Sequence, residues 1–87
     1  MIVWDEQKNT KLKLERNISF EEISELILNE HILDIIDHPK RRNQNVFVLE
    51  INHYVYAVPF VIDENENIVL KTAFPSRNLN KKYRGER

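Results

Sequence analysis

Apolar residues recur at helical spacing in one segment of the N-terminal third. They would form a single face of a helix, made by Phe20, Ile23, Leu26 and Ile27. Ser19 and Glu22 have the spacing of a capping box, and Ile18 with Ile23 has that of a hydrophobic staple. The pattern predicts a helix that begins after Ser19 and ends near Asn29.

The chain before this helix is more polar. Met1 to Trp4 predicts a short strand, and Asp5 is a typical N-cap for a helix over Glu6 to Arg16. The apolar residues of this helix are chiefly Leu12 and Leu14, so we expect it to lie on the surface.

Short β-prone runs dominate the rest of the chain. The expected strands are Ile32 to Asp37, Val46 to Ile51, Tyr54 to Val61 and Ile68 to Phe74. Asn52-His53 fits a two-residue hairpin turn, 63–67 fits a second turn, and His38 to Asn45 fits a loop. Pro59 cannot donate to a ladder, which places it at a bulge or an edge.

Pro75 ends the last strand, and Ser76 caps a short helix from about Arg77 to Tyr83. Strands joined by tight turns pair antiparallel. We therefore expect one α+β domain over residues 1–87, with two N-terminal helices packed on an antiparallel meander and a short C-terminal helix.

The amino-acid composition excludes several classes of protein. The chain has 87 residues, 41% of them hydrophobic, and no cysteine, so disulfides and thiolate metal sites are excluded. No basic and apolar leader opens the sequence, and no stretch approaches the roughly 20 apolar residues of a membrane helix. These features predict a cytoplasmic protein without a membrane contact.

The charge is distributed unevenly along the chain. The net charge is −1 overall, but residues 19–37 carry −6 with no Lys or Arg, and residues 71–87 carry +5. We call residues 19–37 the acidic segment. This division predicts a positive face for an anionic partner, most simply RNA, with the acidic segment directed elsewhere.

Several chemistries are disfavoured. His31, His38 and His53 lack the spacing of a helical metal-ligand pair, so no metal is expected. The one glycine, Gly85, rules out glycine-rich phosphate loops, so no nucleotide cofactor is expected. Serine-nucleophile chemistry is weakly supported, because only Ser19, Ser24 and Ser76 are present and Ser19 has a capping role.

The basic residues are the best functional signal. Lys71 and Arg77 would stabilise a phosphate at the end of the sheet, while Lys81, Lys82 and Arg84 would hold the RNA backbone and Tyr83 would stack on a base. A second cluster, Arg41 and Arg42 with Lys40, lies beside His38 and would complete a positive groove if the loop folds near the tail. The alternative is that both clusters are simply solvated.

Proton transfer has three candidates. The first is His38, because histidine is the usual side chain for proton transfer near neutral pH, and Glu50 with Tyr56 would form an acid/base pair in the central hairpin. The simpler interpretation of His38, which the sequence alone favours, is a surface loop residue, and that of His53 is a turn residue. Tyr54 and Phe60, which alternate with Tyr56, are expected to pack on the sheet.

Three motifs resemble those of BrnT-like toxins, in the RelE/ParE-like superfamily. They are Trp4-Asp5-Glu6-x-Lys8, Asn17-Ile18-Ser19-Phe20-Glu21-Glu22 and Ser76-Arg77. The resemblance spans nearly the whole chain and marks a divergent member, because Arg16-Asn17 stand where such chains usually have histidine and glycine. Asp5, Lys8, Ser76 and Arg77 are the positions that carry over.

This resemblance implies the toxin of a type II toxin–antitoxin pair, a metal-independent endoribonuclease that inhibits translation, with free or ribosome-associated RNA as substrate. Its partner would be a DNA-binding antitoxin from the adjacent gene. Lys8 and Ser76 would then contact RNA, and Lys71 with Arg77 would stabilise the phosphorane. The alternatives are a non-catalytic module that binds nucleic acid or protein, and an inert or regulatory protein with a RelE-like fold.

Overall fold

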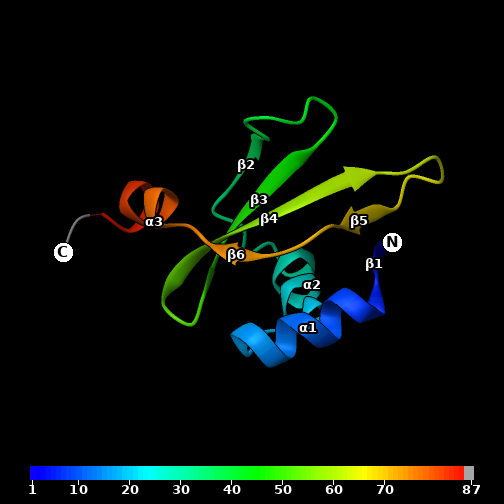
Figure 1. The fold of residues 1–87 in the computed structure, drawn as a ribbon. Helices are drawn as coiled ribbons and strands as arrows, with labels where there is room; N and C mark the ends of the chain where they lie inside the picture. The colour runs from blue at the N-terminus through cyan, green and yellow to red at the C-terminus, as the bar shows by residue number, and fades with distance from the viewer. Residues whose placement is uncertain (86–87) are drawn as a thin grey trace.

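The computed structural model describes residues 1–85 and places six strands in one sheet with three helices. The element order is β1 (Ile2–Trp4), α1 (Glu6–Arg16), α2 (Phe20–Leu28), β2 (Asp34–Asp37), β3 (Asn45–Ile51), β4 (Tyr54–Ile62), β5 (Ile68–Leu70), β6 (Phe74–Pro75) and α3 (Arg77–Arg84). The α+β class and the position of all three helices are as predicted. Figure 1 shows α1 and α2 together on one side of the sheet and α3 near its far end.

The sheet is mixed, which corrects the expectation of a purely antiparallel meander. The strand order is β1-β5-β4-β3-β2, and β1 pairs with β5 in parallel, Val3 opposite Val69. No tight turn joins these two strands, because the rest of the domain lies between them, so nothing forces them antiparallel. The strands that tight turns do join, β3 with β4 and β4 with β5, are antiparallel.

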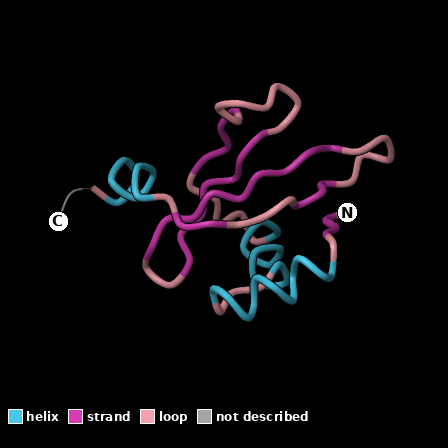
Figure 2. The backbone as a smooth tube through the Cα atoms, in the orientation of Figure 1, coloured by secondary structure: helices cyan, strands magenta, loops and turns pink. Residues whose placement is uncertain are grey.

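The predicted last strand is interrupted. Residues 71–73 separate β5 from β6, and both strands pair with β4, Leu70 opposite Phe60 and Phe74 opposite Ala57. Between these two pairs β4 contributes two residues and the other chain three, so the chain carries one extra residue, a β-bulge. Pro59 lies at this bulge, as its missing N–H predicts, and Lys71 N donates to Pro59 O at 2.9 Å. Figure 2 shows the irregular segment between the two strands.

The core lies between the helices and the sheet. It is formed by Leu12 and Ile18, by Phe20, Ile23 and Ile27 of α2, and by sheet residues including Phe47, Leu49, Val58, Phe60 and Leu70. The capping box at Ser19 is present, with Glu22 N donating to Ser19 Oγ and Ser19 N donating to Glu22 Oε1, both at 3.1 Å. Phe47 and Phe60 stack with ring centroids 4.0 Å apart. The expected packing role of Phe60 is confirmed.

One core residue of α1 is polar. Asn9 is completely buried, and its side chain joins α1 to the start of α2. The first helix is otherwise exposed as predicted, with Leu14 in solvent and Leu12 buried. Between Met1 and Gly85 no helix has the length and apolar character to cross a membrane.

Candidate functional site: a basic groove beside the bulge

One face of α1 carries a row of charged side chains. Lys8, Lys11, Leu12, Glu15 and Arg16 are spaced by three, four, seven and eight residues, which puts them on the same side of a helix. Leu12 is buried and anchors this face against the sheet. The flanking side chains therefore project along the edge of the domain beside the bulge.

The bulge supplies the second wall. β1 pairs only with residues 68–70, so the chain from Lys71 onward has no strand on its outer side. The extra residue at 71–73 changes the direction of the side chains relative to a regular strand. Lys71, Thr72 and Phe74 consequently line the same cavity as the charged face of α1.

The loop between β2 and β3 supplies the third wall. Its conformation is held by His38, whose Nδ1 accepts from Lys40 N at 3.0 Å and from Arg41 N at 3.1 Å. His38 N donates to Gln44 O at 3.1 Å, and Gln44 N donates to Arg41 O at 3.2 Å, which closes the loop. The loop therefore presents His38, Arg41 and Gln44 together.

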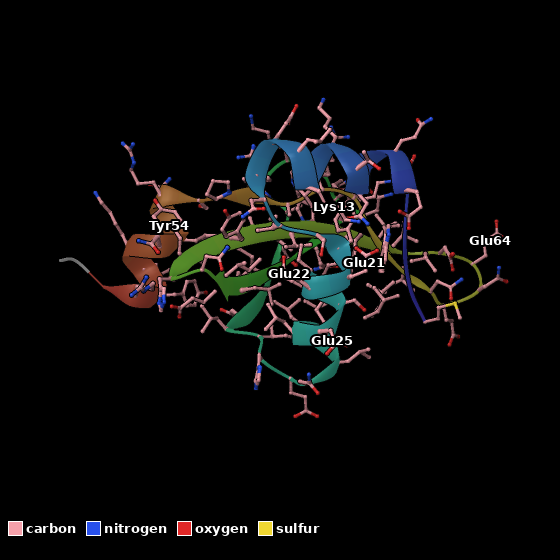
Figure 3. All side chains as sticks on the ribbon, turned by 90° about the horizontal axis from the view of Figure 1, so that it is seen from below. Lys13, Glu21, Glu22, Glu25, Tyr54 and Glu64 are labelled. Atoms are coloured by element: carbon pink, nitrogen blue, oxygen red, sulfur yellow. The ribbon has the colours of Figure 1, made fainter. Side chains whose placement is uncertain are left out.

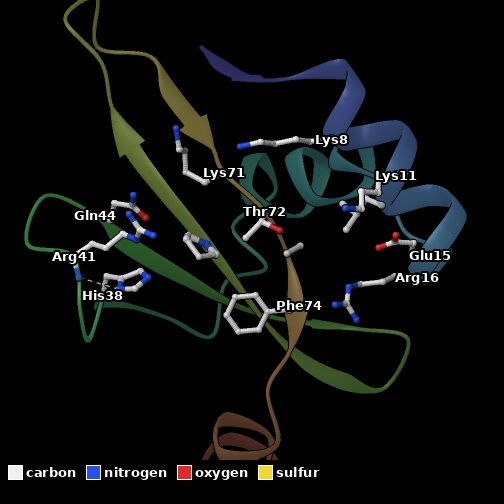
Figure 4. Close-up of a pocket in the computed structure, with 13 residues that line it drawn as sticks. Lys8, Lys11, Glu15, Arg16, His38, Arg41, Gln44, Lys71, Thr72 and Phe74 are labelled. Carbon is white, nitrogen blue, oxygen red and sulfur yellow. Dashed lines mark hydrogen bonds between the residues drawn. The ribbon is translucent and has the colours of Figure 1, made fainter.

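These three segments enclose a groove of about 620 Å³, which we call the basic groove. Its lining residues are Lys8, Lys11, Leu12, Glu15, Arg16, His38, Arg41, Gln44, Pro59, Lys71, Thr72, Ala73 and Phe74. Five of them are Lys or Arg and one is Glu, a formal charge of +4 with His38 neutral. Figure 4 shows α1 on one side, the loop on the other and Phe74 between them.

The groove cations are available to a ligand. Among residues 1–85 the ion pairs join Lys13 to Glu21 at 3.9 Å and Arg84 to Glu50 at 3.7 Å, and neither involves a groove residue. Figure 3 shows Glu21, Glu22 and Glu25 along α2, with Lys13 beside Glu21. No carboxylate of the acidic segment lines the groove. The groove cations come mainly from α1 and the β2–β3 loop, and of the basic residues expected to form the positive face at 71–87 only Lys71 contributes.

The arrangement suits a phosphate chain. Guanidinium and ammonium groups from three segments surround one cavity, and such groups bind phosphate oxygens by charge-assisted hydrogen bonds. Because Nδ1 of His38 accepts two backbone N–H groups, the imidazole proton is on Nε2, so His38 acts as a donor. The groove carboxylate, Glu15, is a proton acceptor. Within the described chain no group of three or more His, Cys, Asp or Glu is placed to hold a metal ion.

The structure brings together four of the predicted site residues: Lys8, His38, Arg41 and Lys71. Arg42 is exposed on the same loop but does not line the groove. The predicted joining of Lys71 with Arg77 is wrong, because Arg77 does not line the groove. Arg77 is the first residue of α3, which Figure 1 shows on the opposite side of β6 from β5.

The remaining α3 candidates have structural contacts or lie in solvent. Ser76 is the N-cap, with its hydroxyl accepting from Leu79 N at 3.2 Å. Tyr83 donates to Asp34 of β2, and Lys82 lies 5.4 Å from the centre of its ring. Lys81 is exposed on the same helix. The loop that carries His38 and Arg41 therefore lies beside Lys71 and α1. The expected groove between this loop and the C-terminal tail does not form.

The predicted acid/base pair of Glu50 and Tyr56 is also wrong. Glu50 lies opposite Val55 in the β3–β4 register, so Tyr56, one residue further, points to the other face of the sheet. Tyr56 packs against the core under the helices, and Glu50 pairs with Arg84. Neither residue lines the groove.

Sequence reasoning missed Lys11, Glu15, Arg16, Gln44, Thr72 and Phe74 as groove residues. The sequence could have indicated the α1 residues, because the spacing of Lys11, Glu15 and Arg16 puts them on the same helical face as Lys8. No sequence pattern indicates Thr72 and Phe74, since the direction of their side chains depends on the bulge.

Comparison with protein-family models, with curated proteins and with solved structures gave no match.

Proposed function

We propose that the chain is a cytoplasmic, metal-independent endoribonuclease, the toxin of a type II toxin–antitoxin pair, which holds an RNA phosphodiester in the basic groove. The observation that supports this proposal is the meeting of Lys8, His38, Arg41 and Lys71 in one cavity. These residues come from three separate parts of the chain, and a solvated charge run would not bring them together. The resemblance to BrnT-like toxins supports the same reading.

The reaction needs no cofactor. The 2′-hydroxyl attacks the adjacent phosphorus, its proton passes to the Glu15 carboxylate, and the phosphorus–5′-oxygen bond breaks to leave a 2′,3′-cyclic phosphate. Arg41, Lys71 and the Nε2–H of His38 stabilise the charge on the pentacoordinate phosphorane. The Lys8 ammonium donates a proton to the departing 5′-oxygen.

The spacing on α1 supports this division of roles. Lys8 and Glu15 are seven residues apart, about 10 Å along the helix axis. A phosphodiester held between them would have the proton acceptor, Glu15, on the side of the attacking oxygen. The proton donor, Lys8, would lie on the side of the leaving oxygen, as in-line displacement requires. Figure 4 shows the two side chains at opposite ends of the α1 wall.

A DNA-binding antitoxin encoded by the adjacent gene is the proposed partner. The acidic segment supports a protein contact, because Leu33 and Ile35 are exposed there beside Asp34 and Asp37 on the edge strand β2. Edge strands with exposed apolar residues favour pairing with another chain.

Purified protein incubated with messenger RNA tests the proposal. We expect cleavage products that end in a cyclic phosphate, in the presence of a chelator, and loss of protein synthesis in a cell-free translation system. Lys71→Ala should lower both activities strongly, and Lys81→Ala, which removes the same charge outside the groove, should not. Absence of cleavage by the wild-type chain, alone and with ribosomes, would remove the nuclease proposal.

A second candidate, an RNA-binding module without catalysis, is favoured by one observation. The Nδ1 of His38 is occupied by backbone donors, which leaves Glu15 as the groove's proton acceptor. Glu15→Gln distinguishes the two, because it should abolish cleavage and retain RNA binding in a nuclease. A binding module would bind RNA with a steep salt dependence and would release no cleavage products, either before or after this substitution.

A further inference from the structure

Phe74 is a large apolar residue that lines the groove and is partly exposed to solvent. Phe74 is 39% exposed as a residue, while the neighbouring Ala73 is 1% exposed and buried in the core. The backbone of Phe74 is fixed by pairing with Ala57 in β4. The ring is therefore held in place and not carried on a free loop.

No aromatic ring or cation is paired with the ring of Phe74 among residues 1–85. Aromatic pairs join Trp4 to Phe20 and Phe47 to Phe60, and the cation over a ring is Lys82 above Tyr83. Phe74 takes part in none of these contacts. Tyr83, the aromatic residue that the sequence suggested for base stacking, is bonded to Asp34 outside the groove.

Cations flank Phe74 on both sides. In Figure 4 the ring lies between His38 and Arg41 of the loop and Arg16 of α1, with Lys71 further along the same chain. A strand of phosphates that passes these cations would bring its bases over the ring. Base stacking on an aromatic side chain beside a positive track is the usual physical basis of single-strand binding.

We infer that Phe74 is the stacking platform for an unpaired base, and that the basic groove takes single-stranded and not duplex RNA. This inference rests on the proposed binding of RNA in the groove. A base within a duplex is already covered by its neighbours on both faces, so only an unpaired base reaches an isolated ring. Every base has a π-face, so Phe74 selects the state of the strand and not its sequence.

The test uses an eight-nucleotide RNA with 2′-O-methyl groups, which cannot be cleaved, both alone and annealed to its complement. We expect the wild-type chain to bind the single strand more tightly than the duplex by fluorescence anisotropy. Phe74→Ala and Phe74→Leu should each weaken single-strand binding about tenfold. Duplex binding and the salt dependence should change little, because no charge is removed.

Leu is the matched control for shape, since it is apolar and lacks a π-face. Phe74→Trp provides a second readout, because its fluorescence should be quenched by the single strand, relative to the wild-type signal from Trp4 alone. Both substitutions are at an exposed position, and thermal unfolding shows whether the variants are folded.

Equal effects of Phe74→Ala on single strand and duplex, or none on either, would overturn the inference. Unchanged RNA binding with weaker retention of the adjacent-gene protein would also overturn it, and would assign Phe74 to a protein interface. Failure of the nuclease proposal is separate, because it appears as absent cleavage while Phe74-dependent single-strand binding remains.

Discussion

The side chain of Asn9 accepts a hydrogen bond at 2.8 Å from the backbone N–H of Phe20, the first residue of α2. Its Nδ2 donates to Glu21 Oε1, also at 2.8 Å, so one buried amide joins two helices through both of its polar atoms. The donation from Asn9 is the main reason that the pKa of Glu21 is lowered. This contact fixes α1, and with it the charged wall of the basic groove, relative to α2.

Asn9→Leu should lower the free energy of unfolding by about 1–3 kcal/mol, because the N–H of Phe20 would be left buried without an acceptor. Urea denaturation followed by circular dichroism measures this change. Asn78→Leu, at an exposed position of α3, is the control and should have little effect. A fully stable Asn9→Leu chain would show that the amide does not hold the helices together.

Stability should depend on pH through Asp34 and Tyr83. The hydroxyl of Tyr83 donates to Asp34, which lowers the pKa of Asp34 from 3.8 and raises the pKa of Tyr83 from 10.0. The Asp34 contribution is complete above pH 3.8 and is lost as the pH falls through its lowered pKa. The Tyr83 contribution is complete below pH 10.0 and is lost as the pH rises through its raised pKa.

Thermal unfolding across this range measures the effect, with Tyr83→Phe as the matched variant. The variant should be less stable than the wild type at neutral pH and should lose the alkaline dependence that comes from this contact. An identical difference between the two chains at every pH would exclude it.

The hairpin turn at Asn52-His53 should accept glycine. Both residues have positive φ, 52° and 66°, as a type I′ turn requires, and this region is strained for side chains other than glycine and asparagine. His53→Gly should therefore raise the free energy of unfolding by about 1 kcal/mol. His53→Ala, which keeps the strain, is the comparison, and denaturant midpoints of the two variants decide the point.

His38 should combine a loop role with a ligand role. In His38→Asn the side-chain oxygen can accept the backbone N–H two residues on, which keeps the turn, but the Nε2–H donor is lost. We expect His38→Asn to melt like the wild type and to bind RNA about tenfold more weakly. His38→Ala should lose both properties, and full RNA affinity in His38→Asn would remove His38 from the site.

The sequence determined the local elements of this protein. The capping box at Ser19, the N-cap at Asp5 and the positive-φ turn at Asn52-His53 each act over a few residues, so their signals are complete in the sequence. The α+β class, the placement of Pro59 at a bulge and the separation of charge along the chain follow from the same short-range rules.

Only the tertiary structure decided which charged residues meet. The parallel β1–β5 pair, the burial of Asn9 and the bulge at 71–73 depend on contacts between distant segments, and they bring Lys71, Arg41 and α1 together while α3 leads Arg77 away. The opposite faces of Glu50 and Tyr56 follow from strand register, which one residue of shift would reverse. The sequence thus supplies the residue types that the groove uses, but the tertiary structure determines which of those residues line it.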